Sequence, residues 1–387
     1  MIGDLLERGI VEVIEKKSLE GKLSSGKKLR IKFGIDPTAP DVHLGHGVPI
    51  RKLAKFQLLG HKVIYIVGDY TATIGDPSGK TKTRETLSKA VVRDYAKKYF
   101  TQAFKILDPQ KTEVHYQSEW FGDFTLYQLI ELTSKVTVEQ LLEHETFRVR
   151  IKKQQPFALH EMIYPILQGY DSVAVKADVE IGGMDQKFNL LMGRQIQKAF
   201  DQPPQDVIMM DYLLGTEGKE KMSKSLGNYI SFLDDSTEMF GKVMSIPDKL
   251  VPKYWELCTD LDMNELKKSL DQNIHLRDLK TRLALEIVAQ FHSREKALES
   301  EREFNRIFRD KELPSRVPQK KVEIRVWRLS NLLVEINLAE SKSEAKRLIE
   351  QRGVRVDGSV IEDPEARFKV YVGMILAVGK RKYIQIV

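Results

Sequence analysis

The sequence predicts an α/β protein whose main domain is built on a parallel β-sheet. From Leu29 onward, short apolar stretches of strand length alternate with longer stretches of helical periodicity. This alternation places successive strands parallel to one another, with right-handed crossovers. The length of 387 residues exceeds what one compact core usually holds, so two or three domains are expected.

The elements of the main domain follow in order. The expected strands are residues 29–35, 62–67, 114–116, 179–181 and 207–210, and the helices between them are residues 43–59, 85–107 and 185–199. Gly60 ends the first helix, and the second has apolar or aromatic residues at four-residue spacing from Leu87 to Ala103. Residues 124–170 are expected to be mostly helical, and they either cover an edge of the sheet or form a subunit interface.

The rest of the chain has a different pattern. Residues 236–308 indicate helices without clear strands, and residues 312–321 have the prolines and polar side chains of a linker. Ser341 and Glu344 form a capping box that opens a helix ending before Gly353, and strands are expected at 354–356, 368–372 and 383–387.

These patterns divide the chain into four parts. We expect a domain of residues 1–225 with a helical insertion at about residues 110–165, a helical domain of residues 226–311, a linker of residues 312–321 and a small α+β domain of residues 322–387.

Composition excludes several classes of protein. With 42% hydrophobic and 30% charged residues, the chain is of the ordinary soluble type. No apolar run approaches the roughly 18 residues of a membrane-spanning helix, and the first 17 residues lack the apolar block of a signal peptide. Cys258 is the only cysteine, which excludes a disulfide within the chain and a cysteine-based zinc cluster. These features favour a cytoplasmic location.

The charge balance points to an acidic partner. The chain has 62 basic and 55 acidic residues, a net charge of +7, and residues 321–387 hold 13 basic and 9 acidic ones. Nucleic acid is the usual partner of such a surface, although a merely basic soluble surface remains the alternative.

The first chemical motif is His43-Leu44-Gly45-His46, which follows a loop of residues 34–40. His43 and His46 share one face at a helix N-terminus, where free N–H groups and the helix dipole favour anions. Gly45 has no Cβ and lets a flat ligand lie against the backbone. Two imidazoles there can stabilise charge on a reacting phosphoryl group, while helix capping or metal binding explains the pair equally well.

The second motif is Lys221-Met222-Ser223-Lys224-Ser225, in a loop that also holds Gly215 and Gly218. Two lysines on such a loop suit a clamp on a triphosphate, although an ordinary surface loop is the alternative. The two motifs together, in this order and about 175 residues apart, resemble the HIGH and KMSKS motifs of class I aminoacyl-tRNA synthetases.

Further residues narrow the resemblance to bacterial-type tyrosyl-tRNA synthetases. Tyr164, Gln168 and Asp171 lie at i, i+4 and i+7 on one helix face, and Asp185 follows two glycines at a helix start. Each of these residues alone has an ordinary explanation as a half-buried helix residue or a turn or cap residue. The sequence from Arg328 to Ile349 resembles the S4-type RNA-binding module that ends such enzymes.

The resemblance implies a Rossmann-like catalytic domain, a helical anticodon-stem-binding domain and an S4-like RNA-binding domain. It implies a tyrosine–tRNA ligase, which joins tyrosine and ATP into tyrosyl-adenylate and transfers the tyrosyl group to the 3′ end of tRNA(Tyr). Mg²⁺ should accompany ATP through phosphate oxygens, without a dedicated metal site in the protein. A homodimer is also implied.

The resemblance assigns roles residue by residue. The catalytic residues would be His43, His46, Lys221, Lys224, Lys80 and Arg84. Tyrosine would be bound by Asp76, Tyr164, Gln168, Asp171 and Gln186. ATP would be bound by Gly45, Gly183, Asp185, Lys224 and Ser225. RNA would be bound by Arg328, Lys342, Lys346, Arg347 and Arg352.

Among these, Asp76, Tyr164 and Gln168 would hold the substrate ammonium group. Asp171 would bind the phenol, Asp185 the ribose, and Gln186 the region of the reacting carboxyl group.

Two positions depart from the family pattern. Lys32 stands where many members have a tyrosine that binds the substrate phenol, so Asp171 becomes the main expected partner of the hydroxyl group. Pro49 replaces a threonine that some members place near the ribose, so the ribose contact is expected chiefly from Asp185.

Three other functions remain open. A tryptophanyl-tRNA synthetase shares the class I fold, but its indole substrate does not need the carboxylate of Asp171. A small nucleotidyltransferase can have the first motif without needing the second motif or an RNA-binding module. A non-catalytic RNA-binding protein derived from a synthetase would not need the intact histidines and lysines.

Overall fold

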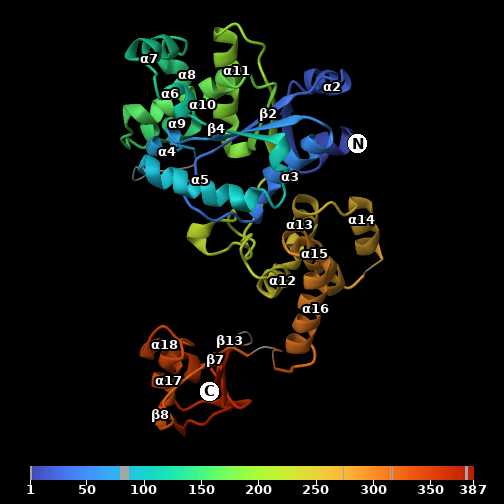
Figure 1. Ribbon diagram of the computed structural model, residues 1–387, viewed down its shortest axis with the longest axis vertical. Coiled ribbons are helices and arrows are strands. Elements are labelled where there is room, and N and C mark those ends of the chain that lie inside the picture. Colours follow the sequence, from blue (N-terminus) through green and yellow to red (C-terminus); the bar gives the residue numbers. More distant parts are fainter. Residues whose placement is uncertain (1, 79–86, 273, 314, 316, 380–381) are drawn as a thin grey trace. The chain divides into compact units, whose positions relative to one another are not determined.

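The computed structural model describes residues 2–78, 87–272, 274–313, 315, 317–379 and 382–387. The chain divides into two compact units, residues 1–294 and 295–387, which are described separately here (Figure 1). The boundaries of the finer division at residues 225 and 311 stay predictions.

The first unit is built on a six-stranded sheet in the order β1-β6-β5-β2-β3-β4. The strands are β1 (Ile10–Ile14), β2 (Arg30–Ile35), β3 (Lys62–Val67), β4 (Thr112–Tyr116), β5 (Val179–Gly183) and β6 (Asp206–Met210). Strands β2 to β6 pair parallel, which confirms the expected fold class. The antiparallel edge strand β1 was not expected.

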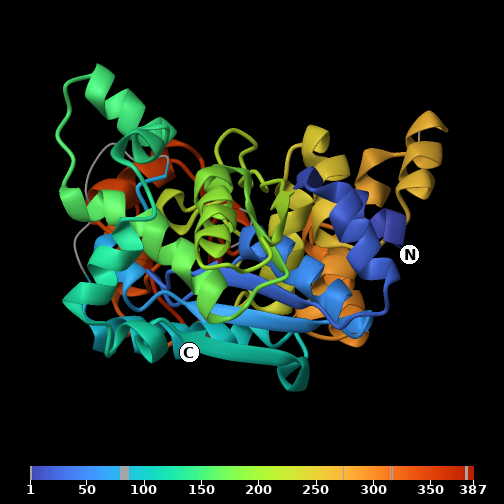
Figure 2. The same ribbon diagram turned by 90° about the horizontal axis from the view of Figure 1, so that it is seen from above.

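Helices cover both faces of this sheet, as Figure 2 shows. Alternate residues of a strand point to opposite faces. Tyr65 of β3 contacts Phe100 of α5 (Lys89–Ala103) on one face. Ile64 and Ile66 pack with Val175 at the end of α10 (Leu159–Ala174) on the other. Helix α11 (Lys187–Ala199) packs beside α10, so the α10 face holds two adjacent helices.

The helix that carries the first motif is α3 (Leu44–Leu58), with His43 as its N-cap. The helix expected at residues 85–107 is shorter than expected at both ends, because within the described residues it spans Lys89–Ala103. It begins after Ser88, whose hydroxyl accepts a hydrogen bond from Val91 N. The expected helix at 185–199 begins with a 3₁₀ turn, η2 (Met184–Gln186), before α11.

The remaining elements of this unit are mostly short helices. They are α1 (Ile2–Glu7), α2 (Lys16–Ser24), α4 (Thr71–Ile74), α6 (Ser118–Phe121), α7 (Leu126–Thr133), α8 (Val138–Leu142) and α9 (Glu145–Lys152). After β6 follow α12 (Ser236–Ser245), α13 (Val251–Cys258), α14 (Met263–Asp271) and α15 (Leu276–Phe291). The expected run of helices after residue 236 is confirmed, and the next helix, α16 (Arg294–Phe308), belongs to the second unit from Glu295 onward.

The second unit has its own sheet and its own apolar core. The sheet order is β10-β9-β12-β13-β7, with β8 and β11 as a separate pair. The strands are β7 (Gln319–Lys320), β8 (Val326–Arg328), β9 (Val354–Val356), β10 (Ser359–Ile361), β11 (Arg367–Lys369), β12 (Ile375–Val378) and β13 (Lys382–Ile386). Buried residues of α17 (Leu329–Glu335) and α18 (Lys342–Glu350) fill the core.

Three expectations for this unit need correction. The expected linker contains β7, which pairs parallel with β13 and is therefore part of the fold. The strand expected at 368–372 ends at Lys369. Ser341 does cap α18 by accepting a hydrogen bond from Glu344 N, but the Glu344 side chain accepts from Glu340 N at 2.7 Å rather than from Ser341 N.

No helix in the described ranges is long and apolar enough to cross a membrane.

Candidate active site

The two motif loops of the first unit are joined by backbone hydrogen bonds. Leu44 N donates to the carbonyl oxygen of Ile230 at 3.0 Å, and Phe232 N donates to the carbonyl oxygen of Val42 at 2.9 Å. These bonds hold the segment after Lys221–Ser225 against the start of α3. Two motifs that are distant in sequence therefore form one site.

His43 and His46 lie together at the N-terminus of α3. Their ring centroids are 3.8 Å apart, and His46 Nδ1 accepts a hydrogen bond from His43 N at 3.3 Å. Burial, with a smaller contribution from the charge of Lys221, lowers the pKa of His46 to about 4. Burial, the neighbouring His46 and Lys221 together lower the pKa of His43 to about 2. Both rings are therefore neutral at neutral pH. His46 therefore caps the helix, which was one of the alternatives considered for the histidine pair. Because its Nδ1 accepts a hydrogen bond, its Nε2 carries the proton and can donate one.

One ring nitrogen of His43, Nδ1, is buried without a hydrogen-bond partner within the described residues. A Cβ on Gly45 would lie 3.0 Å from that nitrogen and 3.5 Å from the Cβ of Met222. The glycine thus keeps the space between His43 and Met222 clear.

The lysines of the second motif are held by carboxylates from other loops. Lys221 Nζ lies 3.3 Å from Asp185 Oδ2, and Lys224 forms an ion pair with Asp41. The hydrogen bond with Asp41 raises the pKa of Lys224. Both lysine side chains are largely exposed, so an incoming anion can compete with the carboxylates for them.

The carboxyl ends of the parallel strands meet on the same side of the sheet, where α/β proteins bind ligands. Asp36 follows β2 there, and its Oδ2 accepts a hydrogen bond from the Tyr164 hydroxyl at 2.9 Å. Its Oδ1 accepts from Thr71 Oγ1 at 2.7 Å. A Cβ on Gly68 would lie 2.1 Å from Asp36 Oδ1 and 2.2 Å from Thr71 Oγ1, so only glycine permits the hydrogen bond between these two atoms.

A second pair of expected substrate residues lies at the same edge. Gln186 Nε2 donates to Asp76 Oδ2 at 2.6 Å, and Asp76 Oδ1 accepts from Ser78 N at 2.9 Å. Asn189 Nδ2 donates to Gln186 Oε1 at 3.0 Å and fixes the orientation of that amide. The carboxylate and the amide are thus oriented before any substrate binds.

Asp171 is 2% exposed on α10, the helix that also carries Tyr164 and half-buried Gln168. Its Oδ2 accepts from Gln117 Nε2 at 2.8 Å, and its Oδ1 accepts from Trp120 Nε1 at 3.1 Å. Burial raises the pKa of Asp171 to about 7. A carboxylate with two fixed donors keeps lone pairs for a further donor, such as a hydroxyl group.

Several of these residues were missed from the sequence. Asp36, Gln117 and Trp120 come just after the strands β2 and β4, so the rule that sites form at the carboxyl ends of strands could have found them. Asp41 carries no such signal, because only the fold brings it to Lys224.

The other expected ATP-binding residues lie around the second motif. A Cβ on Gly183 would lie 2.5 Å from Asp185 Oδ1, so the glycine leaves room for that carboxylate. Ser225 is exposed in the 3₁₀ turn η3 (Lys224–Leu226). Lys80 and Arg84 lie outside the described residues.

The basic residues expected to bind RNA lie in the second unit. Lys346 and Arg328 pair with Glu365, at 3.0 Å for Lys346. Arg352 pairs with Glu362 at 3.0 Å. Lys342 and Arg347 are exposed, and no ion pair involves them in the described part of this unit. Lys342 and Arg347 are therefore the most accessible of the five basic residues to a phosphate backbone.

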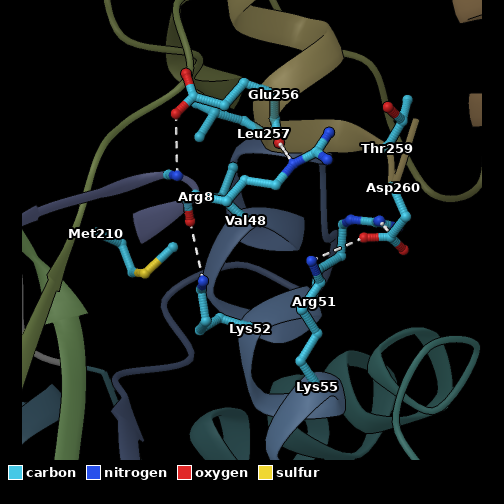
Figure 3. Close-up of a pocket in the computed structure, with 11 residues that line it drawn as sticks. Arg8, Val48, Arg51, Lys52, Lys55, Met210, Glu256, Leu257, Thr259 and Asp260 are labelled. Carbon is cyan, nitrogen blue, oxygen red and sulfur yellow. Dashed lines mark hydrogen bonds and ion pairs between the residues drawn. The ribbon is translucent and has the colours of Figure 1, made fainter. Parts of the chain in front are cut away.

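Figure 3 shows a small cavity lined by α3, the turn before β1 and α13. Its cations already have protein partners. Lys52 Nζ donates to the carbonyl oxygens of Leu5 and Arg8 at 2.7 and 2.9 Å, and Arg51 and Lys55 pair with Asp260. These bonds tie the helix of the first motif to its neighbours, which is a structural role.

No cluster of three or more histidine, cysteine or carboxylate residues that could hold a metal ion occurs among the residues the structure describes.

Comparisons with known proteins agree with this geometry. Residues 24–309 match the family described as tRNA synthetases class I (W and Y), and residues 327–373 match the S4 domain. The sequence is 49% identical to the tyrosine--tRNA ligase of Carboxydothermus hydrogenoformans, over 99% of this chain and 97% of that protein. It is 47% identical to the tyrosine--tRNA ligase of Moorella thermoacetica, over 99% of this chain and 94% of that protein.

Solved structures show the same fold at much lower identity. A C-terminally truncated mitochondrial tyrosyl-tRNA synthetase of Aspergillus nidulans superposes with a TM-score of 0.65 at 22% identity, covering 79% of this chain and 94% of that chain. A tyrosyl-tRNA synthetase of Archaeoglobus fulgidus, complexed with L-tyrosine, gives a TM-score of 0.62 at 20% identity, covering 77% of this chain and 98% of that chain.

Proposed function

We infer the roles of the site residues from one premise: the chain belongs to the class I tRNA synthetases of the tryptophan and tyrosine type. Its function is that of a tyrosine–tRNA ligase, for which the near-full-length identity with curated ligases is the evidence. The enzyme uses ATP, tyrosine and tRNA. The nucleotidyltransferase and non-catalytic alternatives are not favoured.

The observation that carries the choice of tyrosine is the environment of Asp171. A carboxylate that is 2% exposed and fixed by Gln117 and Trp120 fits a hydroxyl group on the substrate ring. A phenylalanine ring would leave the remaining lone pairs of Asp171 without a donor, which is costly for a buried charge. An indole also carries a donor, so tryptophan is the weaker candidate because the near-full-length relatives are tyrosine--tRNA ligases.

In the first step, a carboxylate oxygen of tyrosine attacks the α-phosphorus of ATP. The bond between that phosphorus and the bridging oxygen breaks, and pyrophosphate leaves. We assign the ammonium group of tyrosine to Asp76, Tyr164 and Gln168, and the region of its carboxyl group to Gln186. Because Asp76 and Gln186 are already bonded to each other, the substrate enters a site whose geometry is set.

Charge develops on the α-phosphoryl oxygens in this step. His43 and His46 are neutral, so we assign them hydrogen-bond donation to those oxygens rather than a full positive charge. Gly45 and Gly183 leave space for the nucleotide, and Asp185 would bind its ribose.

The leaving group is held by the second motif. Lys221 and Lys224 exchange their partners Asp185 and Asp41 for the oxygens of pyrophosphate, with Ser225 beside them. The resemblance adds Lys80 and Arg84 to this group. Mg²⁺ would enter with the phosphate oxygens of ATP and supply further neutralisation of their charge.

In the second step, a ribose hydroxyl at the 3′ end of tRNA attacks the carbonyl carbon of the adenylate, and AMP leaves. The S4 module would hold the tRNA through basic residues of the second unit. Its exposed Lys342 and Arg347 are the first candidates, because Arg328, Lys346 and Arg352 are paired with carboxylates.

A homodimer is the proposed assembly, and the cytoplasm is the proposed location. Leu126, Tyr127 and Ile130 of α7 are 73%, 78% and 59% exposed. Large apolar side chains gathered on one exposed helix face are typical of an interface. The variant Tyr127→Glu should convert a dimer into a monomer in analytical ultracentrifugation, whereas an unchanged sedimentation coefficient would contradict this assignment.

Exchange of labelled pyrophosphate into ATP, run with each of the twenty amino acids, tests the function. Tyrosine should support exchange, and tRNA charging should then follow with tyrosine only. Exchange driven by tryptophan would replace the substrate assignment, and exchange by none of the twenty would contradict the enzyme function.

A further inference from the structure

Lys32 is a fully buried lysine in the middle of the main sheet, with 0% of its surface exposed. In the register of the parallel strands it lies opposite Glu180 of β5, which is 1% exposed. The two side chains form an ion pair, with Lys32 Nζ 2.8 Å from Glu180 Oε1. Because Lys32 is covered by protein, it does not replace the phenol-binding tyrosine of the family as a substrate contact.

The ammonium group of Lys32 also binds α10. It donates to the backbone carbonyl oxygen of Gln168 at 3.0 Å and to Ser172 Oγ at 2.7 Å. With Glu180, these partners use all three of its donors. Gln168 precedes Asp171 in the chain and Ser172 follows it. Lys32 therefore fixes the helical turn that carries the phenol-binding carboxylate.

The network extends to α11 and the strand beyond it. Glu180 Oε2 lies 3.4 Å from Ser172 Oγ and accepts a hydrogen bond from the Gln205 amide. Gly193 of α11 leaves the space for it, because a Cβ there would lie 2.6 Å from Gln205 Nε2 and 3.0 Å from Ser172 Oγ. The buried charges are thus fully enclosed by fitted partners.

We propose that the buried Lys32–Glu180 pair is a specificity-determining element of the enzyme, in which Lys32 is a positioning residue. It holds the turn of α10 that carries Asp171 and keeps that carboxylate ionised, so that it accepts a hydrogen bond from the substrate hydroxyl. This proposal rests on the proposed function, since it takes Asp171 as the residue that binds the phenol.

The charges that act on Asp171 have opposite signs. Burial raises its pKa to about 7, while the positive charge of Lys32 lowers the pKa and the negative charge of Glu180 raises it. The effect of Lys32 is the larger of the two. The other groups that face Asp171 are the donors Gln117 and Trp120, which are uncharged, and the Tyr164 hydroxyl is bonded to Asp36.

This arrangement predicts opposite responses from the two partners. Lys32→Met removes the stronger influence and raises the pKa of Asp171, whether or not Glu180 then takes up a proton. Glu180→Gln leaves the positive charge unopposed and lowers the pKa of Asp171. A purely structural role would weaken the site in both variants without opposite changes in pH dependence.

The experiment measures kcat/KM for pyrophosphate exchange with tyrosine and with phenylalanine between pH 5.5 and 8.5. The ratio of the two cancels effects on ATP, the histidines and the lysines, and isolates recognition of the hydroxyl group. In the wild type the ratio should fall on the acid side of about pH 7. Lys32→Met should move this fall to higher pH by about one unit, and Glu180→Gln should move it to lower pH.

At pH 6.5 the tyrosine preference of Lys32→Met should therefore be about tenfold lower than in the wild type, with a much smaller loss at pH 8.5. Shifts in the same direction, no shift, or an equal loss at all pH values would overturn the proposal. If wild-type exchange does not require tyrosine, the proposed function fails instead.

Two further variants guard against simple destabilisation. Lys52→Met removes another buried lysine, one bonded to Leu5 and Arg8 rather than to α10, and it should leave the pH dependence of the ratio unchanged. Lys32→Met/Glu180→Met replaces the ion pair with apolar side chains of similar size, a change that buried pairs often tolerate. Its ratio should fall at higher pH than in the wild type, and an unchanged profile in this folded variant would overturn the proposal.

Discussion

The amide of Gln186 donates a hydrogen bond to Oδ2 of Asp76 at 2.6 Å, although the two residues are 110 positions apart in the chain. Both are assigned to the same substrate, Asp76 to its ammonium group and Gln186 to the region of its carboxyl group. Because the two side chains are in contact, the ammonium group and the carboxyl group of the substrate tyrosine can both bind to this one oriented pair.

The variant Asp76→Asn keeps this contact geometrically possible but removes the negative charge. Loss of a charged hydrogen-bond partner for the ammonium group should lower kcat/KM for tyrosine roughly 10- to 100-fold, with little change in the KM for ATP. Steady-state pyrophosphate exchange measures both constants. A larger effect on ATP than on tyrosine would contradict the assignment of Asp76.

The histidines should act on the rate of activation rather than on binding. His43→Ala and His46→Ala should each lower the rate of adenylate formation roughly 10²- to 10³-fold, as for donors that act on developing oxyanions. The dissociation constant for tyrosine should hardly change, since the contact strengthens only during the reaction. Pre-steady-state measurement of adenylate formation separates the two, and a raised dissociation constant at an unchanged rate would give the histidines a structural role.

The same histidines predict how stability depends on pH. Their pKa values in the folded chain, about 2 and 4, lie below the ordinary value of 6.5, so on acidification the unfolded chain binds protons first. The free energy of unfolding should therefore decrease as the pH falls from about 6.5 toward 4. Denaturant titrations at several pH values measure this, and His46→Gln should lose less stability over that range than the wild type.

The ion pair between Asp41 and Lys224 should compete with the triphosphate. Asp41→Asn frees the lysine, and since an exposed pair contributes at most about 1 kcal/mol, the KM for ATP should decrease by up to about fivefold. Asp94→Asn breaks a comparable exposed pair with Lys98 on α5 and serves as the matched control. If the KM for ATP rises in Asp41→Asn, then Asp41 assists ATP binding.

The two chemical steps should separate by unit. A chain that ends after Leu313 retains every residue assigned to activation and omits the S4 match as well as β7, which pairs with β13. It should form tyrosyl-adenylate at close to the full rate and charge tRNA poorly. In the full chain, Lys342→Gln/Arg347→Gln should reduce tRNA affinity and its dependence on salt. Full charging by the truncated enzyme would contradict the RNA-binding role.

Much of the fold could be predicted from the sequence because local signals agree with it. Strand β3 occupies the residues expected, and the alternation of strands and helices gave the parallel arrangement of β2 to β6. Strand β1, which has Glu12 in its middle, was missed because it precedes the alternation of strands and helices that begins at Leu29. Strand β7 was missed because its two polar residues carry no strand signal and become a strand only beside β13.

For the site, likewise, the sequence predicts which residues share one helix face, but not which residues distant in the chain contact each other. The spacing of Tyr164, Gln168 and Asp171 is a property of one helix, so the sequence places them together. The partner of Lys32 lies 148 positions away, and nothing local says that this lysine is buried or that Glu180 neutralises it. In the same way, the hydrogen bonds of Asp171 with Gln117 and Trp120 depend on how α10 packs beside the residues that follow β4.

The central claim is that Asp171 recognises the hydroxyl group of tyrosine, and Asp171→Asn tests it most directly. The variant keeps the shape of the side chain but replaces a charged acceptor with a neutral amide, which can also donate. The measurement is kcat/KM for pyrophosphate exchange with tyrosine and with phenylalanine, at pH 8, in the wild type and the variant. The account predicts that the preference for tyrosine falls roughly 10- to 100-fold. A variant that keeps the wild-type preference would contradict it.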